Sequence, residues 1–212
     1  LVNQICLLLK LIMKRLDIKT NQNHFIGCWN IEDGNLLKEM IKFFDENESL
    51  QNQGLVGNGK DLSIKNSIDI TIQPSDLKNQ KFEVLNKYMK KLHECYLDYL
   101  SQYPLLKTML DDIHIGKFNL QKYNKDGHFS GVHSERGSLT TLHRLFAWMT
   151  YLNDVEDGGV TNFDHYKIDI KPESGKTLIW PSEWTHAHSG GVVKKGTKYI
   201  ITGWMHFPFK EI

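Results

Sequence analysis

Residues 142–152 read LHRLFAWMTYL, one of several short apolar runs in the second half of the chain. Similar runs lie at residues 113–123, 166–170, 177–180 and 198–207. Glycine-containing turn signals separate the runs, at residues 125–127, 157–159, 173–175, 189–191 and 195–196. Several short strands joined by such turns predict an antiparallel β-sandwich or barrel.

The first half of the chain has mostly the spacing of helices. In residues 35–46, NLLKEMIKFFDE, apolar side chains recur at helical intervals and form one stripe. The stripe consists of Leu36, Leu37, Met40, Ile41 and Phe44. Further along, residues 68–72, IDITI, alternate between isoleucine and polar residues, which predicts a strand that ends before Pro74.

A long helix is expected after this strand. Ser75 is a candidate N-cap with Asp76 in the first turn, and the helical pattern continues to about Leu100. Pro104 is expected to stop any further helix. The predicted buried face of this helix carries Leu85, Met89, Leu92 and Tyr96.

These patterns together predict an α+β fold in one domain. Residues 1–112 would form a helical support region, and residues 113–212 would form the β core. A chain of 212 residues is long enough to bury a core without disulfides or structural metals.

The composition narrows the class of protein. Lys and Arg number 26 and Asp and Glu 25, and this near-neutral balance gives no sign of a nucleic-acid partner. Cys6, Cys28 and Cys95 are odd in number and far apart, which disfavours a disulfide framework or a zinc finger. We therefore expect reduced cysteines and a cytoplasmic location.

The most apolar stretch of the first half is Ile5–Met13, ICLLLKLIM. Lys10 interrupts it, and it is far shorter than the roughly 20 apolar residues that span a bilayer. Its nearest basic residues, Lys14 and Arg15, follow the run, whereas a signal peptide has them in front. We expect a short amphipathic helix here and no membrane span.

Histidines at ligand spacing suggest a metal site. His133 and Glu135 are two residues apart, so on a strand both side chains would point to one face. Imidazole nitrogens with one carboxylate form the facial triad of non-haem Fe(II) oxygenases. The third ligand would come from His186 or His188, which also share a face in an extended segment, and spacing alone does not choose between them.

Lys198 lies in the apolar run at residues 198–207, on the same face as Ile200 and Thr202. A lysine that points into an apolar barrel needs an anion, because an unpaired buried ammonium is costly. A dicarboxylate cosubstrate would supply that anion. The alternative is a surface lysine beside Lys194 and Lys195.

The order of these motifs resembles the prolyl 4-hydroxylase-like branch of the Fe(II)/2-oxoglutarate-dependent dioxygenases. The resemblance covers about residues 113–208 and implies a double-stranded β-helix, or jelly roll, as the fold. The motifs that carry it are LQKYNKDGHF at residues 120–129, His133-Ser134-Glu135, YLNDVEDGGVTNF at 151–163, PESGK at 172–176, WPS at 180–182, His188, GTKY at 196–199 and Trp204.

The resemblance implies that His133 and Glu135 are iron ligands. The family places its distal histidine ten residues before a basic residue, which favours His188, paired with Lys198, over His186. The family usually has aspartate at the carboxylate position, so Glu135 is a departure. The extra methylene changes the reach of the carboxylate, and a retained carboxylate is consistent with hydroxylation rather than halogenation.

The resemblance also implies roles for neighbouring residues. Lys198 would anchor the distal carboxylate of 2-oxoglutarate, helped by Tyr151, and Tyr123 would line the other end of the cosubstrate. Arg144 matches an arginine near the mouth of the site, where it would face substrate. Trp204 matches a wall residue beside the metal.

The implied activity is hydroxylation of an unactivated C–H bond, with release of succinate and CO₂. The implied cofactors are Fe(II), 2-oxoglutarate as cosubstrate and O₂, with ascorbate as a further candidate. The substrate would be a small molecule or a peptide, with peptidyl proline the best-known target of the family. Residues 127–140 are expected to frame the entrance, where Ser134, Arg136 and His143 could contact substrate.

Two other functions fit part of the pattern. A cupin-like metal enzyme would share the HxE motif and the distal histidine, but would not need Lys198, Tyr151 or Tyr123. A non-catalytic binding module on the same fold would need none of the candidate ligands. The sequence does not indicate an oligomeric state.

Overall fold

A computed structural model describes residues 13–57, 59–110 and 112–208. Its centre is a large antiparallel sheet that includes strands from both halves of the chain. In order across the sheet these are β1 (Lys14–Arg15), β2 (Gly27–Asn30), β13 (Lys176–Pro181), β9 (Arg144–Tyr151), β16 (Lys198–His206), β7 (Phe118–Tyr123), β5 (Ile68–Ile72) and β3 (Gln51–Gln53), with β6 (His114–Ile115) paired to β16.

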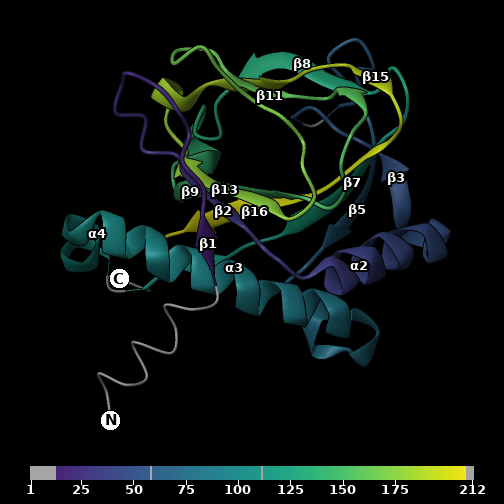
Figure 1. Ribbon diagram of the computed structural model, residues 1–212. Coiled ribbons are helices and arrows are strands. Elements are labelled where there is room, and N and C mark those ends of the chain that lie inside the picture. The colour runs from purple at the N-terminus through teal and green to yellow at the C-terminus, as the bar shows by residue number, and fades with distance from the viewer. Residues whose placement is uncertain (1–12, 58, 111, 209–212) are drawn as a thin grey trace.

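A smaller antiparallel sheet lies on one side of the large sheet, with β8 and β11 visible above it in Figure 1. Its order is β12 (Ile168–Ile170), β11 (Thr161–Phe163), β14 (His188–Gly190), β8 (His128–His133) and β4 (Lys65–Asn66). A separate short pair joins β10 (Asp157–Gly158) to β15 (Val193–Lys195).

Helices cover the other side of the large sheet. They are α2 (Gly34–Glu46), α3 (Glu83–Gln102) and α4 (Pro104–Met109), drawn below the sheet in Figure 1. This order of helices, large sheet and small sheet is the α+β arrangement predicted from the sequence. The structure thus consists mostly of antiparallel strands with few helices.

The strand β9 shows how the layers are built. Its side chains alternate between the two faces of the large sheet. Phe146 and Trp148 belong to the apolar cluster between the large sheet and the helices. Met149 and Tyr151 belong to a second apolar cluster, on the side of the small sheet. The apolar run at residues 142–152 therefore supplies both cores at once.

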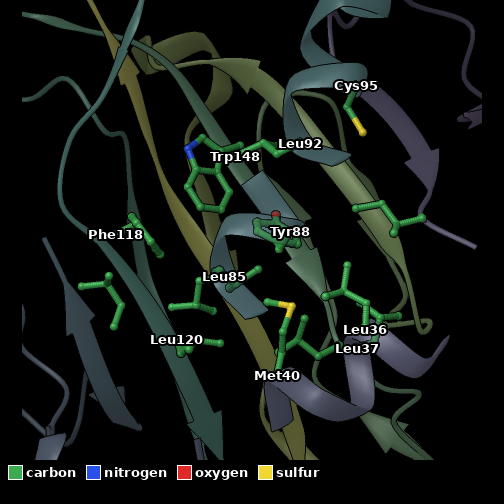
Figure 2. Close-up of a cluster of buried hydrophobic side chains, with 14 of the residues drawn as sticks. Leu36, Leu37, Met40, Leu85, Tyr88, Leu92, Cys95, Phe118, Leu120 and Trp148 are labelled. Carbon is green, nitrogen blue, oxygen red and sulfur yellow. The ribbon is translucent and has the colours of Figure 1, made fainter. Parts of the chain in front are cut away.

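Figure 2 shows the cluster between helices and sheet, where Trp148, Phe118 and Leu120 of the sheet face Leu85, Tyr88 and Leu92 of α3. The Tyr88 hydroxyl lies 2.8 Å from Thr150 Oγ1, so the one polar atom of this ring is hydrogen-bonded. From α2 the cluster takes Leu36, Leu37, Met40, Phe43 and Phe44, which confirms the stripe predicted there except that Ile41 is only partly buried.

The start of the long helix differs from the prediction. Two 3₁₀ turns occupy residues 76–78 and 80–82, and α3 begins only at Glu83. Asn79 adopts an extended backbone between the turns and its side chain accepts from the Lys81 amide, which diverts the chain from a continuous helix. Ser75 makes no side-chain cap. Pro104 starts α4 instead of ending helical structure, because proline is well tolerated at a first helical position.

Strands from the first half enlarge both sheets. β2 pairs with β13, β5 pairs with β7, and β4 pairs with β8. The predicted helical support region therefore also supplies strands, and residue 112 does not divide helices from strands. Local periodicity missed β2, β3 and β4 because they are too short to show alternation.

Some expectations fall outside the described residues. These are the amphipathic helix predicted from residue 5 and the state of Cys6. Cys28 and Cys95 are buried free thiols, and burial raises the pKa of the Cys28 thiol to about 12. Within the described part of the chain, no helix has the length and apolar character needed to cross a bilayer.

Candidate metal centre

Three potential ligand side chains meet between β8 and β14. His133 is the last residue of β8, and it lies directly opposite His188, the first residue of β14. Glu135 follows two residues after β8, at a bend instead of on the strand as predicted. One ligand atom from each residue lies within 4.8 Å of the others, and Glu135 Oε1 is 3.4 Å from His188 Nε2 and 3.7 Å from His133 Nε2.

The backbone orients both imidazoles. His133 Nδ1 lies 2.9 Å from the carbonyl oxygen of Gly131, and His188 Nδ1 lies 2.9 Å from that of His186. A carbonyl can only accept, so each Nδ1 carries the proton and each Nε2 is left with a lone pair toward Glu135. Both rings therefore present the atom that a metal would bind.

The carboxylate of Glu135 is also held on the side that faces away from the two histidines. The Trp204 indole Nε1 donates to Glu135 Oε2 over 2.6 Å, and Arg144 Nη1 donates to the Glu135 backbone oxygen over 3.1 Å. The Arg144 guanidinium also lies 3.7 Å from the centre of the Trp204 ring. Arg144 therefore braces the site directly, in addition to any role toward substrate that the sequence predicted.

These contacts set the protonation of the ligands. Burial alone would raise the pKa of Glu135. In the acidic range where this carboxyl titrates, a hydrogen bond from protonated His188, the charges of protonated His188 and His133 and the hydrogen bond from Trp204 lower this pKa to about 2. Burial lowers the pKa of His133, and His188 adds to this effect. At neutral pH the cluster offers a carboxylate and a neutral imidazole, which are the forms that ligate a metal. Two imidazoles and one carboxylate fit Fe(II).

His186 does not join this cluster. It ends a 3₁₀ turn, Trp184–His186, and so does not share a strand face with His188 as predicted. Its Nε2 lies 2.8 Å from the carbonyl oxygen of His24, and its Nδ1 lies 3.0 Å from Thr185 Oγ1. With both ring nitrogens occupied, His186 acts as a buried structural contact.

Lys198 is buried, with 3% of its surface exposed. Its Nζ donates to the carbonyl oxygen of Gly159 over 3.0 Å and lies 4.5 Å from the centre of the Tyr123 ring. Among the described residues no carboxylate lies within ion-pair distance of it, and burial lowers its pKa from the usual 10.5 to about 8. The alternative of a surface lysine is therefore wrong, and the ammonium is available to an anion.

The two candidate tyrosines lie in the same apolar cluster as Ile200. The Tyr151 hydroxyl donates to Thr161 Oγ1 over 2.6 Å, and the Tyr123 hydroxyl donates to Gln121 Oε1 over 2.8 Å. Burial raises the pKa of both phenols, so both remain protonated. The structure records contact of Lys198 with Tyr123, but the hydroxyl of Tyr151 is bonded to Thr161 instead.

A sequence model of the 2OG-Fe(II) oxygenase superfamily matches residues 118–206. This segment contains the three potential metal ligands and Lys198. Over these residues the chain is similar to this superfamily. The chain is also similar to curated prolyl 4-hydroxylases, in agreement with the resemblance found in the sequence.

The Arabidopsis thaliana "Probable prolyl 4-hydroxylase 9" is 26% identical to this chain over 135 residues, covering 51% of this chain and 47% of that protein. The Gallus gallus "Prolyl 4-hydroxylase subunit alpha-1" is 29% identical over 75 residues, covering 32% of this chain and 14% of that protein. The chain therefore spans less than half the length of these curated relatives.

Solved structures share the fold of this chain. A Pseudomonas putida prolyl-4-hydroxylase superposes with a TM-score of 0.66 at 16% identity, covering 88% of this chain and 95% of that one. A Trichoplax adhaerens prolyl hydroxylase in complex with a hypoxia inducible factor peptide fragment gives 0.68 at 15% identity, covering 97% and 91%.

Two of the residues predicted to contact substrate, Arg136 and His143, make contacts within the protein. The Arg136 guanidinium forms an ion pair with Glu183, and its Nε donates to the Leu142 carbonyl oxygen over 2.8 Å. The His143 ring lies 5.0 Å from that of His206. Arg136 therefore ties the predicted entrance loop to the segment before Trp184.

Sequence reasoning missed a group of polar residues beside Tyr123. Asp69 is buried, although its place in the alternating run at residues 68–72 is also typical of a solvent-facing position. Lys65 and Gln121 are buried with it. The available signal was the alternation of that run. Ile70 and Ile72 join the cluster beside the helices, so Asp69 lies on the opposite face of the sheet.

Proposed function

We propose that this protein is a 2-oxoglutarate-dependent Fe(II) dioxygenase that hydroxylates an unactivated C–H bond of a small molecule or peptide. The observation that carries the proposal is the convergence of His133, Glu135 and His188 in a chain whose Lys198 is a buried ammonium with no carboxylate partner among the described residues. The first feature suits iron and the second suits the far carboxylate of a keto diacid.

We also propose that the facing sheets form a double-stranded β-helix. The support is the pairing of antiparallel strands in two sheets and the similarity to solved hydroxylase folds. In this arrangement β8 and β14 bring the ligands together from segments more than 50 residues apart in sequence.

The protein's own groups would do the following work. His133 and His188 would bind Fe(II) through Nε2, and Glu135 would bind it through its carboxylate. Bound iron would supply the oxidative chemistry, consuming 2-oxoglutarate and O₂ and yielding succinate, CO₂ and a hydroxylated product. Trp204 and Arg144 would keep the carboxylate aimed at the metal, because each contacts Glu135 directly.

The cosubstrate would be oriented from its far end. Lys198 would form a charge-assisted hydrogen bond to that carboxylate. Tyr151 would help only after its hydroxyl turns from Thr161, whereas the ring of Tyr123 already lies against the ammonium. The surrounding apolar residues would exclude water from the reacting groups.

The proposal is tested by titrating 2-oxoglutarate into anaerobic Fe(II)-loaded protein and recording the visible charge-transfer band. A band that saturates supports the proposal. Iron binding without a band would favour the cupin-like alternative, and a protein that binds no iron would favour the non-catalytic module.

Peptidyl proline is the first substrate class to test. Its support is the similarity of the chain to two proteins named as prolyl 4-hydroxylases. Succinate release should be measured over proline-containing peptides, matched peptides with proline replaced by alanine, and free amino acids. Release that depends on proline would assign the class, and equal release from both peptide sets would exclude it.

A further inference from the structure

A buried ion pair joins the two sheets beside the candidate site. Lys65 of β4 and Asp69 of β5 lie with Nζ and Oδ2 only 2.6 Å apart, and their exposed fractions are 4% and 7%. Removing both charges from water is costly, and apolar residues of similar size commonly give equal or greater stability. Stability alone therefore does not account for a pair at this position.

One side of the pair leads to Tyr123. Asp69 Oδ2 accepts from Gln121 Nε2 over 2.9 Å, and Asp69 Oδ1 accepts from Ser67 Oγ over 2.8 Å. Because the amide nitrogen of Gln121 is bonded to Asp69, its Oε1 faces the Tyr123 hydroxyl and accepts from it over 2.8 Å. The ring that this bond holds lies under the Lys198 ammonium.

The other side of the pair leads to the metal ligands. Lys65 Nζ lies 5.5 Å from the centre of the Phe129 ring, within reach of a cation–π interaction. Phe129 in turn stacks on His133, with ring centres 4.1 Å apart and planes inclined by 15°. The same pair thus touches the supports of both His133 and Lys198.

The backbone leaves no spare room around the pair. A Cβ at Gly54 would collide with Ser67 Oγ and would lie 3.0 Å from Lys65 Cε and 3.2 Å from Lys65 Nζ. The absence of a side chain at Gly54 therefore lets the chain close over the ion pair and fix its position.

We propose that Lys65 and Asp69 are positioning residues that set the affinity of the site for a small dicarboxylate. They hold Tyr123 beneath Lys198 through Gln121, and they hold Phe129 against His133. Neither residue is among those proposed to contact iron or cosubstrate. The inference rests on the proposed function, because it assigns the affinity that the pair controls to the cosubstrate. Lys65 and Asp69 both precede the segment that matches the superfamily, residues 118–206.

The test is the double variant Lys65→Met/Asp69→Asn, which removes both charges and leaves no buried ion unpaired. 2-Oxoglutarate is titrated by calorimetry into Mn(II)-loaded protein, which reports binding without turnover. We expect a folded protein that binds 2-oxoglutarate at least fivefold more weakly than wild type. The variant Gln121→Leu keeps the ion pair but removes the hydrogen bonds of Gln121 with Tyr123 and with Asp69. It is measured in parallel and should weaken binding in the same direction.

The matched control is Lys42→Gln/Glu46→Gln, which neutralises an exposed ion pair on α2. Its affinity for 2-oxoglutarate should equal that of wild type. Wild-type affinity in a folded Lys65→Met/Asp69→Asn protein would overturn the positioning role. If that protein does not fold, wild-type affinity in Gln121→Leu overturns it. A wild-type protein that binds no 2-oxoglutarate would instead contradict the proposed function.

Discussion

The indole nitrogen of Trp204 donates its hydrogen bond to Glu135 Oε2 over 2.6 Å, while Glu135 Oε1 faces the two histidines. One carboxylate oxygen is thus held by the large sheet, and the other is left for a metal. Glutamate is longer than the aspartate usual at this position, and the bond from Trp204 limits the extra freedom that the added methylene brings.

Removing this bond should weaken metal binding. Trp204→Phe keeps an aromatic ring near Arg144 but loses the donor to Glu135. Groups that orient metal ligands typically contribute about 10–100-fold in affinity, so we expect Mn(II) or Fe(II) affinity to fall by about tenfold or more. The control is Trp184→Phe, a change at an exposed side chain. Unchanged metal affinity in Trp204→Phe would show that Glu135 needs no such support.

The two neighbouring histidines should behave differently when removed. His188→Ala deletes a proposed ligand and should abolish stoichiometric iron binding. His186→Ala deletes a ring bonded to the His24 carbonyl, so it should retain iron and lower the free energy of unfolding by about 1–3 kcal/mol. Iron content after gel filtration and thermal unfolding would be measured together. Equal iron content in the two variants would contradict the choice of His188.

Lys198→Met should separate binding from stability. The ammonium is buried with a lowered pKa of about 8, so the folded state bears a cost for its charge at neutral pH. A shift from 10.5 to about 8 corresponds to a cost on the order of 3 kcal/mol, which is an upper limit for the stabilisation from removing the charge. We expect equal or higher thermal stability together with a large loss of 2-oxoglutarate affinity. Wild-type affinity would refute the anchor.

The affinity for 2-oxoglutarate should also depend on pH. The lysine must be protonated to bind a carboxylate, and in the free protein its pKa is about 8. Affinity should therefore be level below about pH 8 and fall as pH rises above it. Calorimetry on Mn(II)-loaded protein between roughly pH 6.5 and roughly pH 9.5 would trace the curve. The weak residual binding of Lys198→Met should lack this fall above about pH 8.

The same pKa shift has a consequence for folding. The unfolded lysine has the higher pKa, so between pH 8 and about 10.5 the unfolded state binds more protons than the folded state. The contribution of Lys198 to the free energy of unfolding must therefore rise with pH across this window. Wild type should gain stability relative to Lys198→Met as pH increases there, and a constant difference would contradict the shifted pKa.

Part of the candidate site could be predicted from residue spacing. His133 and Glu135 are close in sequence, and the resemblance to a known family favoured His188 and Lys198. Structure brings these ligands together and buries the lysine, but it places Glu135 past the end of β8. The carboxylate nevertheless lies 3.4 Å from His188 Nε2.

Other site features depend on contacts between distant segments. Lys65 and Asp69 lie in a region that local patterns predict as a support, and β4 is too short to show any periodicity. The sequence alone does not distinguish His186 from His188. In the structure, the ring of His186 is hydrogen-bonded to the carbonyl oxygen of His24, more than 150 residues away in sequence.

The sequence by itself determined the strand-rich second half, the stripe of α2 and the set of residue types able to hold a metal. These features depend on local alternation and spacing of residues, which are present in the sequence whatever the tertiary contacts are. Only the tertiary structure decided which histidine faces Glu135, that Lys198 lacks a carboxylate partner within the described chain, and that Lys65 and Asp69 meet beside Tyr123. Each of these depends on the pairing of strands from distant segments. The pairing determines which side chains are buried beside one another and which charged or hydrogen-bonding partners each of them has.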